Sequence, residues 1–389
     1  MLDLNYKPLE VVDTQGMPND KWLDYRTTGI GGSDVAAIYE VSGWTTKRAL
    51  YYSKMKLSKS EPGNPYTLAF GHQVEPFLAT WFIDATENSQ EGTAGVSVSQ
   101  KYKDWLERKM GVKIQKIFCY KDTIMYRHPL FPFMQANLDY RIRIITDSGE
   151  VKEGIFECKT TSYHIGPEKW GEQFETKVPL EYELQCRHYM SVMNLDFVII
   201  ACCWGSTEAD YRVRYLQRDL DFEEEIIAHE KDFWENNVLK KSPPPLSLEH
   251  SKQELEAFHS YKIADRIKSG EVQEIDNSEK KLNDAIDLYL SALDKKTALE
   301  NAVAIQEKQM NIAKLQILEC LADKIDESKK SVEFAVKENG NIQTVIKNNR
   351  VDKEGFKTNS FREDYPELYK KYSYPISYRV FKVKDVSCQ

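Results

Sequence analysis

The spacing of apolar residues changes along the chain between the two-residue repeat of strands and the longer repeat of helices. Alternating or continuous apolar runs predict strands at 112–120, around 124–125, and at 134–145, 154–161, 196–204 and 211–217. Helical spacing predicts a short helix that begins at Lys21 and longer helices at 46–56, 64–85, 178–194 and 222–240. Residues 1–20 show neither repeat and are expected to form an irregular lead-in. The pattern therefore predicts an α/β fold with a central mixed sheet flanked by helices.

The proline run Pro243–Pro245 marks the clearest boundary in the chain. Beyond it, residues 278–324 predict one long helix, because apolar residues recur at near-heptad spacing without proline or glycine. So narrow a stripe must pack on another helix, either of its own domain or of another subunit. Further predicted elements are a helix at 250–268, a hairpin from 331–336 and 342–347, a short helix at 362–372 that Pro366 breaks, and a final strand at 378–384. The predicted domains are 1–242, a linker and long helical segment at 243–330, and a small α+β element at 331–389.

Composition and charge exclude several classes of protein. The 389 residues exceed one typical domain, and the 41% hydrophobic and 29% charged residues are ordinary for a folded chain. Without an apolar run of membrane-spanning length or a signal peptide, we expect a cytoplasmic protein with no membrane contact. Seven cysteines without a C-x-x-C pair predict reduced thiols and no structural zinc. The net charge of −8 excludes wholesale coating of DNA but allows a local basic groove.

Charged residues fall inside an apolar hairpin that is predicted for Phe133–Thr161. Asp139 lies in the middle of the first strand of this hairpin, Asp147–Gly149 supplies turn residues, and Glu157 and Lys159 end the second strand. Because Glu157 and Lys159 are two residues apart, they point to the same side of the strand. Buried charges are costly unless they are paired or bound to a metal, so their presence here indicates a function.

A divalent cation fits these residues. Carboxylates from adjacent strands bind Mg²⁺ through hard oxygen ligands, and the backbone carbonyl of Cys158 is a candidate third ligand. Lys159 would then orient or deprotonate the attacking water, with a pKa lowered by burial and by the metal. The alternative is a surface hairpin with an Asp and an ordinary Glu/Lys pair, because Glu-x-Lys is a common triplet.

A glycine-rich turn precedes a helix in the segment RTTGIGGSDVAAI. Such a turn offers backbone N–H groups and the positive end of a helix dipole to an anion. Arg26 stands seven residues before Ser33, a spacing that would let a guanidinium and a hydroxyl share one phosphate. The segment is neither a Walker A loop nor a dinucleotide-binding fingerprint. The alternative is a capped helix after a glycine turn, which the local sequence favours.

Two helices carry further candidates. Glu75 falls on the inward side of its helix, immediately before Pro76, and is either a salt-bridged core residue or a third acidic group of the metal site. Gln185 and Tyr189 lie one turn apart on one face of their helix, and the helix alone favours a solvent-facing polar side. The histidines show no ligand spacing and are expected to be structural or exposed.

Taken together, the motifs resemble one protein family. GIGGSDVAAI with an upstream arginine, FGHQVEP, ANLDY, FECKT and LQCRHYM occur in the order found in YqaJ-type phage recombinases. That family is the lambda-exonuclease branch of the PD-(D/E)XK nuclease superfamily. The match spans about residues 21–193, and the set is specific although each motif alone is weak. The tail REDYPELYKKY…YRVFKVK is similar to extensions on some phage members.

The resemblance implies a role for each matching residue. Asp139 and Glu157 would be the metal carboxylates, and Lys159 would be the catalytic lysine. Glu75 would be a helix-borne acid that binds metal or positions water. Gln185 would be the glutamine near the scissile phosphate.

The resemblance also implies that Arg26 and Ser33 hold the 5′-phosphate of a DNA end. One position departs from the family pattern. Many relatives have glycine after the metal aspartate, whereas Tyr140 follows Asp139 here. A bulky aromatic residue should keep this position extended, so the backbone turn at the metal is expected to differ.

The function implied by the resemblance is that of a Mg²⁺-dependent deoxyribonuclease with a restriction-endonuclease-like fold, in which Mn²⁺ would substitute. It would degrade double-stranded DNA ends from 5′ to 3′ in phage-type homologous recombination. The expected partners are DNA ends, a single-strand annealing protein and further copies of the chain in a ring, in a bacterial host cytoplasm if the chain is phage-encoded. The alternatives are a structure-specific endonuclease, a non-catalytic module that binds DNA ends or a partner, and a scaffold based on the long C-terminal helix.

Overall fold

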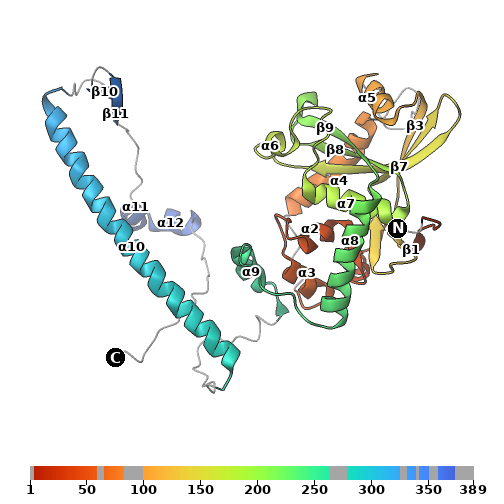
Figure 1. Ribbon diagram of the computed structural model, residues 1–389, viewed down its shortest axis with the longest axis horizontal. Coiled ribbons are helices and arrows are strands. Elements are labelled where there is room, and N and C mark those ends of the chain that lie inside the picture. Colours follow the sequence, from red (N-terminus) through yellow and green to blue (C-terminus); the bar gives the residue numbers. More distant parts are fainter. Residues whose placement is uncertain are drawn as a thin grey trace. The chain divides into compact units, whose positions relative to one another are not determined.

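In the computed structural model, a five-stranded sheet has the strand order β3-β6-β7-β8-β9 (Figure 1). Its strands are β3 (Ile114–Lys121), β6 (Tyr140–Thr146), β7 (Val151–Thr160), β8 (Phe197–Cys203) and β9 (Tyr211–Gln217). β7 and β8 run parallel, whereas the other neighbours are antiparallel. Every residue of β8 is buried, as expected for a strand covered on both faces. The predicted mixed sheet is confirmed.

The structure describes residues 4–58, 65–82, 100–262, 278–324, 331–338, 341–349 and 358–372. The chain divides into two compact units, Met1–Gly270 and Glu271–Gln389. The division therefore falls after the prolines at 243–245 and not at them. Those prolines stay with the first unit because the Arg48 guanidinium donates to the carbonyl of Pro244 at 2.5 Å, and because the helix that follows packs on the same unit.

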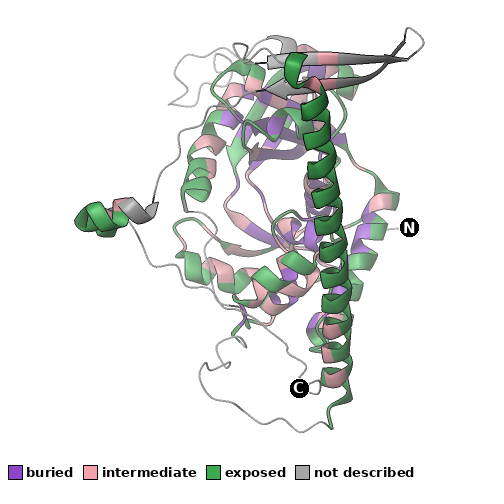
Figure 2. Ribbon diagram, turned by 90° about the vertical axis from the view of Figure 1, so that its left-hand side faces the viewer, coloured by how far each residue is buried: buried purple, intermediate pink, exposed green. Residues whose placement is uncertain are grey.

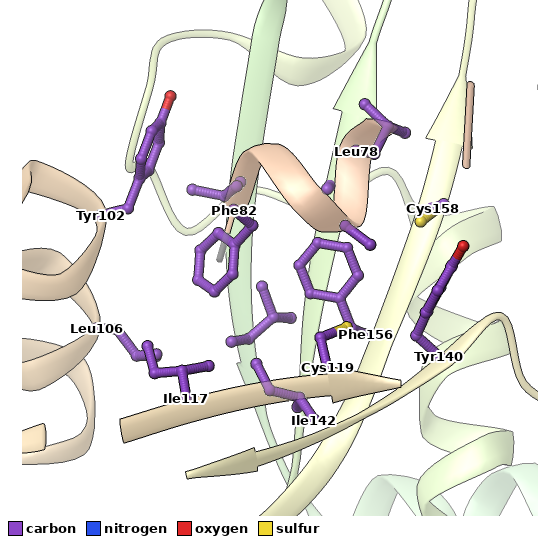
Figure 3. Close-up of a cluster of buried hydrophobic side chains, with 14 of the residues drawn as sticks. Leu78, Phe82, Tyr102, Leu106, Ile117, Cys119, Tyr140, Ile142, Phe156 and Cys158 are labelled. Carbon is purple, nitrogen blue, oxygen red and sulfur yellow. The ribbon is translucent and has the colours of Figure 1, made fainter. Parts of the chain in front are cut away.

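Helices cover both faces of the five-stranded sheet. On one face lie α4 (Pro65–Phe82) and α5 (Gln100–Met110), and on the other lies α7 (Leu180–Met193). The first layer joins Leu78, Phe82 and Leu106 of the helices to Ile142 and Phe156 of the strands (Figure 3). The second layer joins Cys186, Met190 and Val192 of α7 to Ile155, Val198 and Ile200 of the sheet. The flanking helices expected from the sequence are thus present, although α5 was not among them.

A second, four-stranded sheet has the order β1-β4-β5-β2. Its strands are β1 (Leu9–Asp13), β4 (Ile124–Arg127), β5 (Met134–Asn137) and β2 (Ile30–Gly31). The irregular lead-in predicted for residues 1–20 is therefore partly wrong, because β1 pairs antiparallel with β4. The register of that pair shifts between Glu10 and Val12, which interrupts the strand repeat in the sequence.

The strand predicted at 134–145 is two strands. Its first part, β5, belongs to the four-stranded sheet, and its second part, β6, belongs to the five-stranded sheet. The chain crosses from one sheet to the other at Leu138 and Asp139. Asp139 therefore does not lie in the middle of a strand, and this prediction is wrong. The rest of the predicted hairpin is confirmed, because β6 pairs with β7 across the turn that contains Asp147–Gly149.

Shorter helices complete the first unit. They are α1 (Asn19–Arg26), α2 (Gly32–Ile38), α3 (Lys47–Lys54), α6 (Gly166–Trp170), α8 (Leu220–Asp232), which continues as a π-helical segment at Phe233–Leu239, and α9 (Ser251–Phe258). Near the sheet edge, Glu208–Asp210 form a 3-10 turn. The described cysteines, Cys119, Cys158, Cys186, Cys202, Cys203 and Cys320, are free thiols, as the sequence predicts.

A buried polar cluster joins α7 to α8 and β5. His188 Nδ1 lies 2.7 Å from Glu230 Oε1, and both side chains are fully buried. The other ring nitrogen lies 2.8 Å from the carbonyl oxygen of Gln135, which can only accept, so Nε2 carries a hydrogen. Burial lowers the pKa of His188, but the Glu230 carboxylate outweighs burial and raises it overall. His188 is therefore structural, as expected for the histidines.

The second unit contains α10 (Lys280–Leu321), a helix of 42 residues that continues as a 3-10 turn at Ala322–Lys324. β10 (Ser331–Glu338) and β11 (Asn341–Asn349) form the expected antiparallel hairpin. The short helix expected at 362–372 is broken at Pro366, as predicted, into α11 (Thr358–Asp364) and α12 (Pro366–Tyr372). The final strand predicted at 378–384 lies outside the described residues.

Candidate active site

One cleft gathers all the side chains and the backbone group predicted for the site. It encloses about 490 Å³ and lies in the first unit. Its lining includes Arg26, Ser33, Glu75, Asp139, Glu157, Cys158, Lys159 and Gln185. These residues come from α1, α2, α4, α7, β7 and the crossing between the two sheets. The fold therefore brings together positions that are far apart in the sequence.

Asp139 is positioned by the crossing between β5 and β6. Its Oδ2 accepts a hydrogen bond of 2.9 Å from the backbone N–H of Cys158, which fixes the carboxylate against β7. Burial raises the pKa of Asp139, Lys159 opposes this effect, and Glu75 adds to it, so that the pKa is raised overall. A buried carboxyl with a raised pKa is an ionisable group that the fold holds at an energetic cost.

Glu157 lies at the centre of a hydrogen-bond network. Its Oε1 accepts from Lys159 Nζ at 2.5 Å and from Gln185 Nε2 at 2.7 Å. Its Oε2 is buried and has no hydrogen-bond partner among the described residues. Burial, followed by the charge of Asp139, raises the pKa of Glu157 to about 8. One carboxylate oxygen is thus bound by protein donors, and the other is left for a further cation or donor.

Lys159 is a charged donor in this arrangement. The sequence predicts that burial lowers its pKa, but the structure gives the opposite direction. Burial does lower the pKa, yet Glu157 and Asp139 outweigh it, so the pKa of Lys159 is raised. Its ammonium also lies 5.4 Å from the ring centroid of Tyr182, which favours the charged form. The protein groups alone therefore shift the pKa of Lys159 opposite to the predicted direction, and the effect of a bound metal on this pKa stays a prediction.

The donor set suits a hard divalent cation. Asp139 and Glu157 offer carboxylate oxygens, and Glu157 Oε2 has no hydrogen-bond partner among the described residues. The negative charges of the two carboxylates repel each other, and a bound cation would relieve this repulsion. No group of three or more His, Cys, Asp or Glu side chains in the described part of the chain is already arranged around a metal position. The residues therefore fit a cation held mainly by Asp139 and Glu157. The carbonyl of Cys158 stays a predicted ligand.

Glu75 is held by two basic side chains. Lys121 Nζ lies 3.0 Å from Glu75 Oε2, and His72 Nδ1 lies 3.3 Å from Oε1. The sequence left two alternatives for Glu75: a salt-bridged core residue, or a third acidic group of the metal site. Glu75 is salt-bridged, and it also lines the cleft together with Asp139 and Glu157, so the structure fits both. Lys121 was not predicted. Only the register of β3 against β6 could have indicated Lys121, because it places Lys121 opposite Tyr140. The Lys121 ammonium lies 4.8 Å from the centroid of the Tyr140 ring.

Tyr140 is 9% exposed and begins β6 in an extended conformation. This agrees with the expectation that a bulky aromatic residue keeps the position after Asp139 extended. The ring packs in the cluster shown in Figure 3. It therefore anchors the crossing between the sheets on the side away from α7.

Arg26 and Ser33 form the other end of the cleft. The Arg26 guanidinium donates to Ser33 Oγ at 2.6 Å and lies 3.4 Å from Asp34 Oδ1. It also stacks over the Trp22 ring, with its central carbon 4.9 Å from the centroid. The predicted pairing of a guanidinium and a hydroxyl is therefore present, although their role toward a phosphate stays a prediction.

Asp34 is a buried carboxylate that contacts the residues at this end of the cleft. Its Oδ2 accepts from Lys54 Nζ at 2.6 Å and from the backbone N–H of Gly31 at 2.8 Å. Lys54 Nζ also donates to the carbonyl of Arg26 at 2.8 Å. Burial raises the pKa of Asp34, but Lys54 and Arg26 outweigh it and lower the pKa overall. Asp34 and Lys54 were missed as site residues; the only sequence signal was the position of Asp34 directly after Ser33.

Gly32 lets the two ends of the cleft approach each other. A Cβ atom at Gly32 would lie 2.6 Å from the Tyr189 ring and 2.9 Å from the Gln185 side chain. The glycine therefore allows α2 to pack directly on α7, where Gln185 holds Glu157. Gln185 and Tyr189 are each 7% exposed, so the solvent-facing alternative for this side of α7 is wrong.

Comparisons with known proteins agree with the resemblance found in the motifs. Residues 21–196 match the family described as YqaJ-like viral recombinase domain. The chain is 26% identical over 380 residues to the uncharacterized protein YqaJ of Bacillus subtilis strain 168, covering 95% of this chain and 96% of that protein. The expected resemblance to YqaJ-type phage recombinases is thus confirmed for this segment.

Two solved structures are similar at a lower level. The alkaline exonuclease LHK-Exo from Laribacter hongkongensis has a TM-score of 0.37 and 14% identity, covering 62% of this chain and 100% of that chain. A phage related exonuclease from Haemophilus somnus 129PT has a TM-score of 0.32 and 12% identity, covering 57% of this chain and 100% of that chain. In addition, no helix in the described ranges combines the length and apolar character of a membrane span.

Replacing Gly32 by alanine tests the close approach of α2 and α7. We expect Gly32→Ala to lower the free energy of unfolding by about 1–3 kcal/mol, because the methyl group overlaps the Tyr189 ring. Urea unfolding followed by tryptophan fluorescence measures this loss. Gly43→Ala is the matched control, because a Cβ at Gly43 meets nothing within 4 Å. Equal stability of the Gly32 variant and the control would contradict the packing described.

Proposed function

We propose that this protein, whose residues 21–196 match the YqaJ-like viral recombinase domain, is a metal-dependent deoxyribonuclease that degrades double-stranded DNA ends from 5′ to 3′. One observation carries the proposal: a single cleft combines a buried Asp–Glu–Lys group with an Arg–Ser pair. The first group suits phosphodiester hydrolysis, and the second suits recognition of a terminal phosphate. A site of only one kind would support a narrower proposal.

The chemistry follows from the charges of the first group. Mg²⁺, or Mn²⁺ in its place, would supply an activated water and a Lewis acid when bound by Asp139 and Glu157. Lys159 stays protonated beside these carboxylates, so it would donate to the phosphate or the water and stabilise negative charge as it develops. Gln185 holds Glu157 Oε1, which keeps the carboxylate in one orientation while Oε2 stays available.

Glu75 would complete the site from α4. Its carboxylate is 19% exposed and is held by Lys121 and His72, so it can position a water or contact the cation from outside the buried pair. Lys121 also brings positive charge to a cleft that must accept a phosphate backbone. This local charge is compatible with the acidic net charge of the whole chain.

The Arg26 end of the cleft would bind the 5′-phosphate. The guanidinium offers a planar fork that matches phosphate oxygens, and the Ser33 hydroxyl beside it adds another donor. Asp34 and Lys54 lock the arginine in place from the buried side. A phosphate held here, in the same cleft as Lys159, would set the distance from the DNA end to the reacting bond. This arrangement favours an exonuclease over an endonuclease.

The family resemblance supports the wider context of the proposal. A nuclease of this kind would produce a single strand for an annealing protein during phage-type homologous recombination. Further copies of the chain would assemble in a ring around the DNA, in a bacterial cytoplasm. Each of these partners rests on the resemblance and is tested separately from the chemistry.

Digestion of linear duplex DNA tests the proposal, with a label at the 5′ or the 3′ end. We expect loss of one strand from its 5′ end with Mg²⁺ and no loss with EDTA. Lys159→Ala should lower the rate by about 10²- to 10³-fold, because a charge that stabilises the transition state is lost. Lys152→Ala is the matched control, since Lys152 lies on the same strand and pairs with Glu150 outside the cleft.

Other outcomes would replace the proposal. Cutting of closed circular duplex at a similar rate would favour the structure-specific endonuclease. Binding to DNA ends without hydrolysis at any metal concentration would favour the non-catalytic module. Full activity of Lys159→Ala would remove this cleft from the chemistry altogether.

The preference for phosphorylated ends tests the role of Arg26. We expect Arg26→Ala to reduce the rate on 5′-phosphoryl ends at least tenfold and to leave the rate on 5′-hydroxyl ends nearly unchanged. The rate of Arg26→Lys on 5′-phosphoryl ends should lie between the rates of Arg26→Ala and of the unaltered protein, because lysine keeps the charge but loses the planar fork. Lys21→Ala, an exposed change on the same helix, is the control. The same ratio of the two rates in Arg26→Ala and in the unaltered protein would exclude Arg26 as the phosphate ligand.

A further inference from the structure

The long helix α10 exposes a stripe of mainly apolar residues. None of its residues is buried, and Figure 2 colours almost all of it as exposed. Val303 is 56% exposed, Met310 70% and Ile317 43%. Exposed apolar residues at a regular spacing are costly in water and indicate a surface that packs on a partner.

The stripe repeats every four and three residues without interruption. Its positions are Leu282, Ile286, Tyr289, Leu293, Lys296, Glu300, Val303, Glu307, Met310, Lys314, Ile317 and Leu321. Eight of these twelve residues are apolar or aromatic, and four in the middle part, two lysines and two glutamates, are charged. This spacing is that of the core positions of a coiled coil, in which a charged core residue selects the orientation of the partner.

We propose that α10 pairs with α10 of a second copy of this chain in an antiparallel coiled coil. Read from either end of the helix, the first two core residues are a leucine and an isoleucine, and the fourth is Leu293 or Met310. When the two helices run in opposite directions, Leu282 meets Leu321, Ile286 meets Ile317, Leu293 meets Met310, and Lys296 meets Glu307 of the partner subunit. Tyr289 meets Lys314, a pairing of a ring with a cation.

Charge decides between the two orientations. In a parallel pair in register, each charged core residue faces itself, so that Lys296, Glu300, Glu307 and Lys314 make four layers of like charge. In the antiparallel pair, Lys296 and Glu307 attract each other twice, once on each side of the twofold axis. Glu300 meets Val303 there, but its charge is paired within its own helix with Lys296 at 3.5 Å. The antiparallel pair therefore avoids every like-charge layer.

The composition of α10 favours a second copy over nucleic acid. The helix carries six lysines and six acidic residues, so it has no net charge. A DNA-binding helix needs an excess of basic residues to neutralise phosphates. A neutral helix whose charged core residues pair with those of an antiparallel copy fits an isologous interface, in which both subunits use the same surface.

Charge reversal tests the pairing in the full-length chain. Sedimentation velocity over a range of concentrations would follow the mass of the unaltered protein, Lys296→Glu, Glu307→Lys and the double variant. We expect each single change to weaken self-association about tenfold or more, because it sets like charges opposite each other in two layers. The double change should restore most of the association. Lys308→Glu, the same kind of change outside the stripe, should have no effect.

The position of Cys320 tests the orientation independently of stability. Cys320 is exposed and directly precedes Leu321, just as Ala285 directly precedes Ile286. In the antiparallel pair, Cys320 lies beside Ala285 of the partner subunit, and the two Cys320 thiols are about 55 Å apart along the helices. We would therefore treat Cys388→Ser and Ala285→Cys/Cys388→Ser proteins with a short bis-maleimide and count cross-linked dimers.

The expected result is cross-linked dimer in the protein with Ala285→Cys and little in the protein without it. Cross-linked dimer in the Cys388→Ser protein alone would indicate a parallel pair and would overturn the proposal. A mass that is equal in the unaltered protein and in both single charge variants would overturn it as well. Restoration by the double variant is the outcome that a merely unfolded single variant cannot produce.

Discussion

Two carboxylates buried at one end of a mixed sheet require positive charge, and much of the first unit is arranged around that requirement. Asp139 raises the pKa of Glu157, and burial raises the pKa of both. Lys159 supplies one positive charge from the same strand as Glu157. The second oxygen of Glu157 has no donor among the described residues. Because Lys159 is the fixed positive charge and Glu157 Oε2 has no donor, the site can accept a further cation, as the proposed chemistry requires.

The fold meets this requirement through long-range contacts. The chain crosses between two sheets at Asp139, and a backbone N–H of β7 then holds the carboxylate. α7 contributes Gln185 from the opposite face, and Gly32 allows α2 to approach α7 closely enough to share the cleft. The buried His188–Glu230 pair fixes α7 against α8. Each contact joins segments that are distant in sequence, so the cleft exists only in the folded unit.

Local periodicity was sufficient to predict part of this structure. The continuous apolar run of β8 and the two-residue spacing of Glu157 and Lys159 depend only on neighbouring residues, and both predictions are confirmed. The break at Asp139 was missed because the alternation of apolar residues continues across it. Lys121 was missed because strand register brings it to the cleft, and Lys54 was missed because helix packing brings it to Asp34 and to the carbonyl of Arg26. The direction of the Lys159 pKa shift was missed because the sequence does not give the balance between burial, which lowers this pKa, and the charges of Glu157 and Asp139, which raise it.

Titration of the DNA-free protein with Mn²⁺, followed by calorimetry or electron paramagnetic resonance, tests the central claim most directly. We predict saturable binding of at least one ion per chain, with affinity reduced at least tenfold in Asp139→Asn and in Glu157→Gln. Glu153→Gln, a change on the same strand at a residue paired with Arg141 outside the cleft, should bind as the unaltered protein does. Absence of saturable binding, or full affinity in Glu157→Gln, would contradict the account of these carboxylates as the holders of a catalytic cation.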